Sequence, residues 1–294
     1  MYNRKVKYKP VDVIIFALLG ATIAFFIYRI NVGLNYKWAW HKIPQFLFRY
    51  DTVNDRWASN IIMWGLYNTL RLSFWGILLA TIFGTVMGVA RSSKIVFFRL
   101  ISGTYVESMR NLPPLVIIYI VYFFIGDQVM PDAGLDSFLQ ETAPWVRKIT
   151  DFCFATPQFI TAFFSALLTL AIFEGAYITE IVRSGIQSIN RGQWEASYAL
   201  GLSRWQQMRY VILPQAYQRI LPPLAGQFIS LIKDSSIVSV ISIQELTFQG
   251  TELMTSTLLT MEIWITITIL YLALTLPCSL LVARLENFMA RSRR

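Results

Sequence analysis

A few ionisable side chains interrupt otherwise apolar stretches of this sequence, and their chemistry needs an explanation. They are Glu107, Arg110, Glu174, Lys233 and Asp234. Charged groups at membrane depth are costly, so they either pair with one another or line the route of a polar solute. These residues therefore point to the binding and passage of a polar solute.

The first pair allows two interpretations. Glu107 and Arg110 are three residues apart, so they can pair along one helix. Pro113 and Pro114 follow and should break the helix there. A broken helix that faces a cavity is a common device in transporters. We therefore expect either a structural pair or a pathway lining that includes Asn111 and Pro113.

The other charged residues are more isolated. Glu174 lies in IFEGAYITE, where no neighbour in sequence neutralises it. Its partner is either the ammonium group of a substrate or an arginine from another helix. Lys233 and Asp234 are adjacent, so their side chains point about 100° apart on a helix and do not simply pair. With Ser235 they indicate a polar pathway.

Two further sites have simpler interpretations. Glu180 and Arg183 are three residues apart near the end of an apolar stretch, which predicts an interfacial ion pair. Arg71 is near one end of another such stretch. We expect its side chain to extend to the interface, and the alternative is a site that attracts anions.

The composition defines the elements that must position these residues. The chain has 294 residues, 55% of them hydrophobic and only 15% charged, and a mean hydropathy of +0.49. Soluble proteins carry about 25% charged residues. We predict an all-α polytopic membrane protein whose spans each approach the roughly 20 residues that cross a bilayer. The six predicted spans are Val11–Ile30, Ile61–Ala90, Leu100–Gly126, Phe159–Val182, Pro222–Ile243 and Leu258–Val282.

The distribution of basic residues predicts the orientation. Sixteen of the 26 lysines and arginines fall on one side of a six-span chain, in both termini and two loops. Basic residues mark the cytoplasmic side, so both termini are predicted to be cytoplasmic. This also accounts for the net charge of +9 without a nucleic-acid partner. The intervening loops, 31–60 and 127–157, are rich in aromatic and acidic residues and are predicted to be external.

Several kinds of chemistry are disfavoured. There is no GxxxxGK[ST] phosphate loop and no loop large enough for a nucleotide-binding domain. If ATP drives this protein, it binds to another chain. One histidine and two cysteines, distant from one another, do not suggest a metal site. We expect no catalytic residues and no bound cofactor.

The loop 184–214 is too polar to cross a bilayer and has a clear helical pattern. Residues 193–200 can form two helical turns. Gly201 can end them in the left-handed conformation. Ser203 and Gln206 then form a capping-box pattern for a second helix, and Pro214 is expected to limit that helix. One face of the second helix should carry Trp205, Met208 and Ile212.

Such a helix-corner-helix can act in two ways. Its first helix is expected to expose Trp194, Tyr198 and Leu200 beside Glu195. A rigid knob of this kind can dock into a groove on a partner protein. It can equally lie on the lipid surface as an amphipathic loop. The residue pattern by itself does not choose between them.

The loop resembles the cytoplasmic loop of binding-protein-dependent ABC importer permeases. That family has Glu-Ala-Ala, three residues, Gly, nine residues and Ile-x-Leu-Pro. Here the matching segments are Glu195-Ala196-Ser197, Gly201 and Val211-Ile212-Leu213-Pro214, with Ser197 and Val211 as the departures.

The resemblance extends over roughly Trp64–Asn287 and is to the polar amino acid branch of the family. Glu107–Tyr119, ESMRNLPPLVIIY, is similar to that branch's Glu-x-x-Arg-Gly-x-Pro element, with Asn111 in place of Gly. The run Lys233-Asp234-x-Ser236 is usual in the branch whatever amino acid is carried, which favours a role in the fold or in gating.

The resemblance implies a division into residues 1–60, with an extra helix and an external loop, and a permease core of 61–294. It implies that the loop contacts an ATPase subunit through Gly192, Trp194, Glu195, Ala196, Ser197, Tyr198, Leu200 and Gly201.

The implied partners are a second permease chain, a pair of ABC ATPase subunits that hold ATP and Mg, an external solute-binding protein, an amino acid substrate and the lipid of a bacterial inner membrane. The alternative function is a secondary transporter or channel that uses the charges within the spans.

Overall fold

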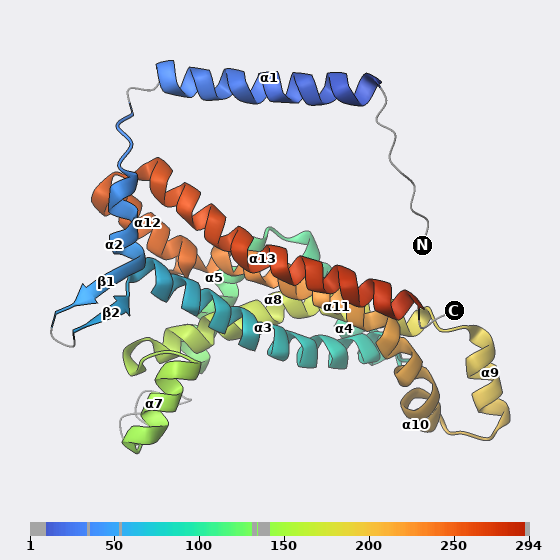
Figure 1. The fold of residues 1–294 in the computed structure, drawn as a ribbon. Coiled ribbons are helices and arrows are strands. Elements are labelled where there is room, and N and C mark those ends of the chain that lie inside the picture. The colour runs from blue at the N-terminus through green and yellow to red at the C-terminus, as the bar shows by residue number, and fades with distance from the viewer. Residues whose placement is uncertain (1–9, 34–35, 53–54, 131–133, 135–141, 292–294) are drawn as a thin grey trace. The chain divides into compact units, whose positions relative to one another are not determined.

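The computed structural model describes residues 10–33, 36–52, 55–130, 134 and 142–291, and nearly all of them are helical. They fall into two compact units, residues 1–41 and 42–294. Figure 1 shows the helices as coiled ribbons. The first unit contains helix α1 (Pro10–Gly33), and a short 3-10 turn, η1 (Trp40–Lys42), follows it.

Helix α1 coincides with the predicted first span. Apolar side chains such as Val13, Phe16 and Leu19 are exposed along it. A helix that is apolar on all sides suits a lipid environment. The basic cluster at positions 4–9 lies outside the described residues.

The second unit holds all the remaining elements. It begins with α2 (Ile43–Leu47) and a two-stranded antiparallel hairpin, β1 (Phe48–Asp51) and β2 (Arg56–Ser59). The central helices are α3 (Ile61–Arg91), α4 (Val96–Asn111), α5 (Pro114–Phe124), the π-turn η2 (Ile125–Val129), α7 (Pro144–Cys153), η3 (Pro157–Phe159) and α8 (Ile160–Gln187). The last are α9 (Arg191–Ala199), α10 (Arg204–Gln206), the π-turn η4 (Gln207–Ile212), α11 (Leu213–Asp234), the 3-10 turn η5 (Ser235–Ile241), α12 (Leu246–Thr257) and α13 (Thr260–Arg291).

Four helical runs among the described residues are long and apolar enough to cross a membrane. They are Ile61–Arg91, Pro157–Gln187, Arg204–Ile241 and Thr260–Met289, and they match four of the predicted spans. The first and third predicted spans correspond to shorter apolar runs, Pro10–Phe26 and Pro114–Phe124. The all-helical membrane fold is therefore confirmed, and the count of six spans stays a prediction.

Two pairs of adjacent prolines differ in whether they interrupt a helix. The predicted break is present, because α4 ends at Asn111 and α5 begins at Pro114. The predicted start of a span at Pro222 is wrong, since Pro222 and Pro223 lie inside α11. The sequence also gave no indication of α12, a separate short helix between the last two spans.

Helices α3 and α8 form the centre of the second unit (Figure 1). At their closest approach a Cβ on Gly88 would lie 2.6 Å from the Cβ of Val182, so only glycine fits there. Two buried apolar clusters lie along this pair. One includes Leu72, Phe163 and Leu167 near α7, and we call its side the α7 end. The other includes Val182 and lies near α9, at the α9 end.

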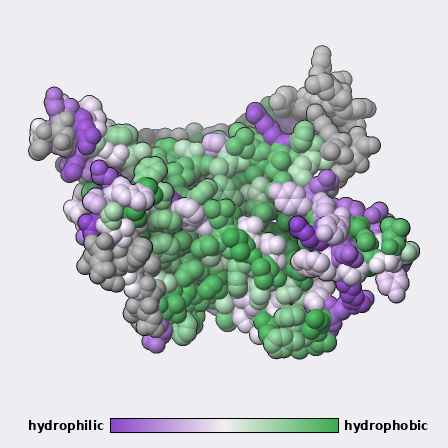
Figure 2. Space-filling view, turned by 90° about the horizontal axis from the view of Figure 1, so that it is seen from below, coloured by the Kyte–Doolittle hydropathy of each residue, from purple (hydrophilic) through white to green (hydrophobic). Residues whose placement is uncertain are grey.

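The surface of the molecule is also divided, into regions of different polarity. In Figure 2 apolar residues gather over the middle of the face, and hydrophilic residues gather towards its two sides. Apolar side chains such as Leu78, Ile82 and Val86 on α3 are exposed. A broad apolar belt between polar ends is what a bilayer requires.

Candidate functional site: a knob at the α9 end and a polar cluster within the bundle

Helix α9 begins at a side-chain cap. The Oδ1 of Asn190 accepts a hydrogen bond of 2.8 Å from the backbone N–H of Gly192. Such a cap satisfies one of the free N–H groups at a helix start. The loop 184–214 therefore does contain the predicted short helix, which begins two residues earlier than expected.

The two faces of α9 have different roles. Glu195, Tyr198 and Leu200 are exposed, the last two at 77% and 79%. The prediction that Trp194 is exposed is wrong, because it is half-buried against the apolar cluster at the α9 end. Ser197 is buried beside it, and its hydroxyl donates to the carbonyl of Trp194. Positions 194 and 197 thus form the inner face of α9.

Glu195 has a local partner as well as an open side. Its carboxylate lies 3.2 Å from the guanidinium of Arg191, and both side chains are largely exposed. An exposed pair at this spacing contributes about 0.5 kcal/mol or less. The acid is therefore free to exchange this partner for another.

The corner after α9 is built as the sequence predicts. Gly201 has a φ of +73°, the left-handed conformation that glycine adopts without strain. Ser203 and Gln206 form a complete capping box. The side-chain amide of Gln207 donates to the carbonyl of Leu202 at 2.9 Å. These bonds make the corner rigid.

The second helix of the loop departs from the prediction. Its helical run passes through Pro214 and continues to Ile241. The π-turn η4 precedes Pro214, and its wider hydrogen-bond spacing accommodates a residue that lacks an N–H. The same turn shifts the helical phase, so Trp205 is exposed whereas Ile212 is buried.

Helix α9 is attached firmly to the bundle. The amide of Gln215 on α11 donates to the side chain of Gln193 at 3.1 Å. Arg219, also on α11, donates to the backbone carbonyl of Ser188 just before α9. A movement of α9 would therefore be passed directly to α8 and α11.

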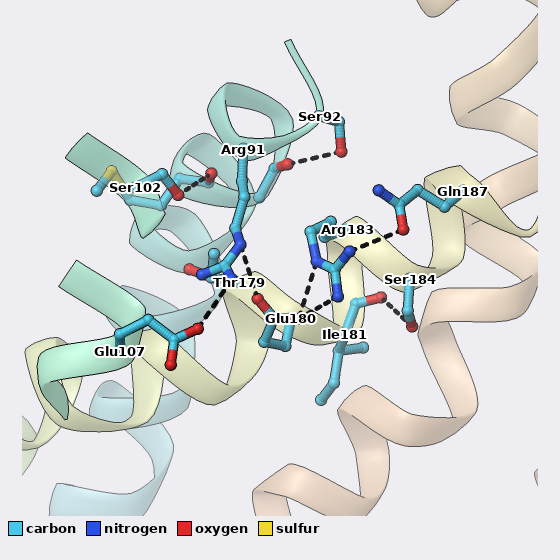
Figure 3. A network of polar contacts seen from close by, with 12 residues as sticks. Arg91, Ser92, Ser102, Glu107, Thr179, Glu180, Ile181, Arg183, Ser184 and Gln187 are labelled. Carbon is cyan, nitrogen blue, oxygen red and sulfur yellow. Dashed lines mark hydrogen bonds and ion pairs between the residues drawn. The ribbon is translucent and has the colours of Figure 1, made fainter. Parts of the chain in front are cut away.

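A network of four charged side chains lies along the last third of α8 (Figure 3). Arg91 lies 3.0 Å from Glu180 and 3.2 Å from Glu107. Arg183 lies 2.6 Å from Glu180, as predicted, and also donates to Gln187. The two positive and two negative charges balance and connect α3, α4 and α8. We call this the Arg91 network.

The predicted pair of Glu107 and Arg110 is not formed. Glu107 instead pairs with Arg91 and accepts a hydrogen bond of 2.9 Å from the amide of Asn111. The guanidinium of Arg110 lies 5.7 Å from the ring centre of Tyr177 on α8. Arg110 thus lies over Tyr177 and does not form an ion pair with Glu107.

A second polar group lies in the middle of α8. Glu174 is fully buried, and its Oε2 accepts a hydrogen bond from the amide of Gln227 on α11. Its other oxygen, Oε1, has no hydrogen-bond partner. The carboxyl of Asp234 lies close enough to interact with it. The alternative in which an arginine neutralises Glu174 is wrong for the described part of the chain, whose ion pairs do not include Glu174.

We call Glu174, Asp234, Gln227, Tyr177 and Arg110 the polar cluster. Tyr177 connects its two halves, since it lies near Arg110 and within electrostatic range of both carboxyl groups. The arrangement offers two carboxyl groups and one guanidinium, which are the partners of an ammonium and a carboxylate.

The other predicted pathway residues lie at the edge of this cluster. Lys233 is exposed and does not form an ion pair with Asp234 within the described structure. Ser235 is buried and donates to the carbonyl of Ile232 at 2.8 Å. Asn111 and Pro113 are exposed at the break between α4 and α5.

Sequence reasoning missed three residues. Arg91 was counted only as a basic loop residue, whereas it is the centre of a network. Tyr177 and Gln227 were not singled out. A neutral glutamine inside a span is itself a weak signal, because a buried amide needs partners.

Arg71 is not extended towards the interface as expected. Its side chain is only 7% exposed, and Nη1 donates to the carbonyls of Asp151 and Phe154 at the end of α7. Tyr67 and Trp75, one turn away on either side, bind the carbonyls of Phe152 and Cys153. One stripe of α3 thus holds the end of α7.

Within the described ranges, no three His, Cys, Asp or Glu side chains gather closely enough to hold a metal ion. The residues brought together are acid, amide, phenol and guanidinium groups, which suit reversible binding of a polar molecule.

Most of the chain is similar to proteins of one known family. Residues 59–291 match the family model described as binding-protein-dependent transport system inner membrane component. The glutamine transport system permease protein GlnP of Escherichia coli K12 is 34% identical over 232 residues, which cover 79% of this chain and 94% of that protein. The probable glutamine ABC transporter permease protein GlnM of Bacillus subtilis is 31% identical, with 79% and 95% covered.

Two solved structures of transporters are also similar to this chain. A crystal structure of an amino acid ABC transporter with histidines contains a chain that is 31% identical, with a TM-score of 0.61 over 77% of this chain and 93% of that one. The methionine ABC transporter MetNI in an inward-facing conformation has a TM-score of 0.54 at 18% identity, over 78% and 96%, and is similar in fold.

Proposed function

The chain belongs to the family of binding-protein-dependent transport system inner membrane components, and from this premise we propose that it is the membrane subunit of an ATP-driven importer of polar amino acids. Relatives named for the transport of glutamine and of glutamate and aspartate support the substrate class. In this function the chain has no catalytic residues of its own.

The observation that carries the proposal is the form of α9. It is a short helix fixed to α8 and α11 on one face and open on the other, where Glu195, Tyr198 and Leu200 are exposed. We propose that this open face docks into a partner ATPase. Closure of the ATPase around ATP and Mg would then pull on α9 and, through its fixed face, on the two helices of the bundle.

The predicted contact residues fall into two groups, one on the inner face of α9 and one on its outer face. Trp194 and Ser197 support α9 from within, since they are turned towards the bundle. Glu195, Tyr198 and Leu200 touch the partner directly. Ala196, Gly192 and Gly201 contribute through the shape and exposure of the backbone.

The polar cluster supports a pathway for a zwitterion. The buried carboxyl groups of Glu174 and Asp234 attract the ammonium of an amino acid, and Arg110 attracts its carboxylate. Two carboxyl groups against one guanidinium favour a neutral or basic amino acid over an acidic one. Lys233, Ser235, Asn111 and Pro113 border this route.

We further propose the remaining partners and the orientation that membership of the family favours. The chain pairs with a second permease chain in a bacterial inner membrane and receives its substrate from an external binding protein. The α9 end and both termini are cytoplasmic, and the α7 end with loop 127–157 is external. Neither the family model nor the relatives support the alternative of a secondary transporter or channel.

The test is a charge reversal on α9 in the complete complex. With Glu195→Arg, the ATPase subunits that co-purify in detergent should fall about tenfold, as for a lost charged contact at an interface. The matched control is Glu252→Arg on α12, where the acid is also exposed.

Uptake into liposomes completes the test. Wild-type complex should accumulate a polar amino acid only with ATP and the binding protein, and Glu195→Arg should abolish this ATP-driven uptake. A wild-type chain that purifies alone and transports without ATP would overturn the proposal.

A further inference from the structure

A pocket of about 260 Å³ lies at the α7 end of the second unit, far along α3 from α9. Three segments form it: the first turns of α3 with Trp64 and Arg71, the approach to α8 with Thr156 and Gln158, and the turn before α12 with Gln244. The pocket shares no residue with the polar cluster, so it is a separate site.

The walls of this pocket are fixed by hydrogen bonds. The amide of Asn68 donates to the carbonyl of Gln244 at 2.7 Å, which ties the turn before α12 to α3. Ser242 in that turn has a φ of +61°. The hydrogen bond of Asn68 therefore joins two of the three segments that form the pocket.

Arg71 is the charged group of the lining. It is 93% buried, and the ring centre of Tyr67 lies 3.8 Å from its guanidinium carbon. Both of its backbone contacts use Nη1, and its buried Nε has no hydrogen-bond partner. An unpaired buried N–H of a cation is costly, so a site that leaves one open is suited to an acceptor from outside the chain.

A carboxylate is the acceptor that fits best. The planar guanidinium presents two parallel N–H groups along one edge, and a carboxylate accepts both. The open donor of Arg71, the charged residue of this lining, matches the carboxylate of a free amino acid.

We propose that this pocket is a second amino acid site, in which Arg71 binds the α-carboxylate of the substrate. The inference rests on the proposed amino acid transport. Because the α7 end is the predicted external side, the pocket receives the substrate before it reaches the polar cluster.

The experiment measures equilibrium binding of radiolabelled L-glutamine to the purified permease–ATPase complex, without the external binding protein. It uses a Glu174→Gln background, which removes a carboxyl group of the polar cluster. Binding should persist there, fall at least tenfold with Arg71→Gln, and resist competition by L-glutaminamide, which lacks the carboxylate. Arg147→Gln removes an exposed charge from α7 and should change nothing.

A second variant distinguishes loss of the binding site from misfolding of Arg71→Gln. Ala162 lines the pocket but does not hold α7, so Ala162→Leu fills the space and leaves Arg71 in place. It should weaken binding as much as Arg71→Gln does. Tyr67 and Trp75 continue to hold the end of α7 in both variants.

Two results would overturn the inference. One is unchanged glutamine binding in both variants while the wild-type complex shows ATP-driven uptake, which leaves the proposed function intact. The other is that the two variants lose co-purified anionic phospholipid and keep their glutamine binding. That result would assign the pocket to a lipid phosphate. Absence of any ATP-driven uptake by the wild-type complex would instead count against the proposed function.

Discussion

Two groups of charged side chains lie along α8, and they differ in their charge balance. In the Arg91 network, Glu180 is shared between Arg91 and Arg183, at 3.0 and 2.6 Å. In the polar cluster, Glu174 faces a second carboxyl group and a neutral amide. The two acids are only six residues apart in sequence.

The difference separates structural charge from functional charge. The Arg91 network balances its charges within the chain, whereas a carboxyl beside a second carboxyl has no opposite charge there. The polar cluster is therefore kept for something the chain itself does not supply, which we propose is the ammonium group of the substrate. Removal of charge should consequently have opposite effects on stability in the two places.

The largest effect should come from Arg91→Met. It leaves Glu107 and Glu180 without their shared cation, and loss of one partner from a mostly buried network costs about 3 kcal/mol. Thermal unfolding of the purified chain, followed by tryptophan fluorescence, should show a large fall in Tm. The control is Arg99→Met, which removes an exposed charge from α4. Equal Tm values for the two variants would contradict a structural role for the network.

Glu174→Gln should act in the opposite direction on stability. It keeps the shape and removes one of two like charges, so the Tm should stay the same or rise. ATP-driven uptake should fall at least tenfold, since an amide attracts an ammonium far less than a carboxylate does. Glu252→Gln on α12 is the matched control. A clear fall in Tm would show that Glu174 is part of the internal charge balance.

This contrast also explains what the sequence could predict. The helix break before Pro114, the left-handed Gly201, the capping box at Ser203 and the pair of Glu180 with Arg183 are all confirmed. In each case the interacting groups are within a few residues, so spacing alone determines the geometry.

The errors arise where partners are distant or the helical phase shifts. Arg91, the partner of Glu107, is 16 residues away, and Gln227, the partner of Glu174, is 53 residues away. Only the packing of α3, α4, α8 and α11 brings them together. The π-turn η4 misled the assignment of Trp205, because a period of 3.6 residues does not hold across it.

A smaller effect tests whether the polar cluster is held in place. Gln227→Leu removes the donor to Glu174 and leaves a buried carboxyl oxygen unpaired, which should cost about 1 kcal/mol. In a Glu174→Leu background the same change should cost almost nothing, because the bond is already lost. Thermal unfolding of the four proteins in this double-mutant cycle measures the difference. Equal costs in both backgrounds would mean that the amide does not support Glu174.

The smallest effect should come from Glu107→Gln. Its side chain is 64% exposed, whereas Arg91 and Glu180 are each 17% exposed, so Glu107 is the outer arm of the Arg91 network. An exposed ion pair contributes little to stability, so the Tm should hardly change and the small difference should vanish at high salt. Glu180→Gln in parallel should be far more harmful, because it leaves Arg91 and Arg183 without their shared acid. If the two variants were equally destabilised, the outer arm would matter as much as the inner pairs; a difference would show that the pairs of Glu180 with Arg91 and Arg183 carry the stability of the network.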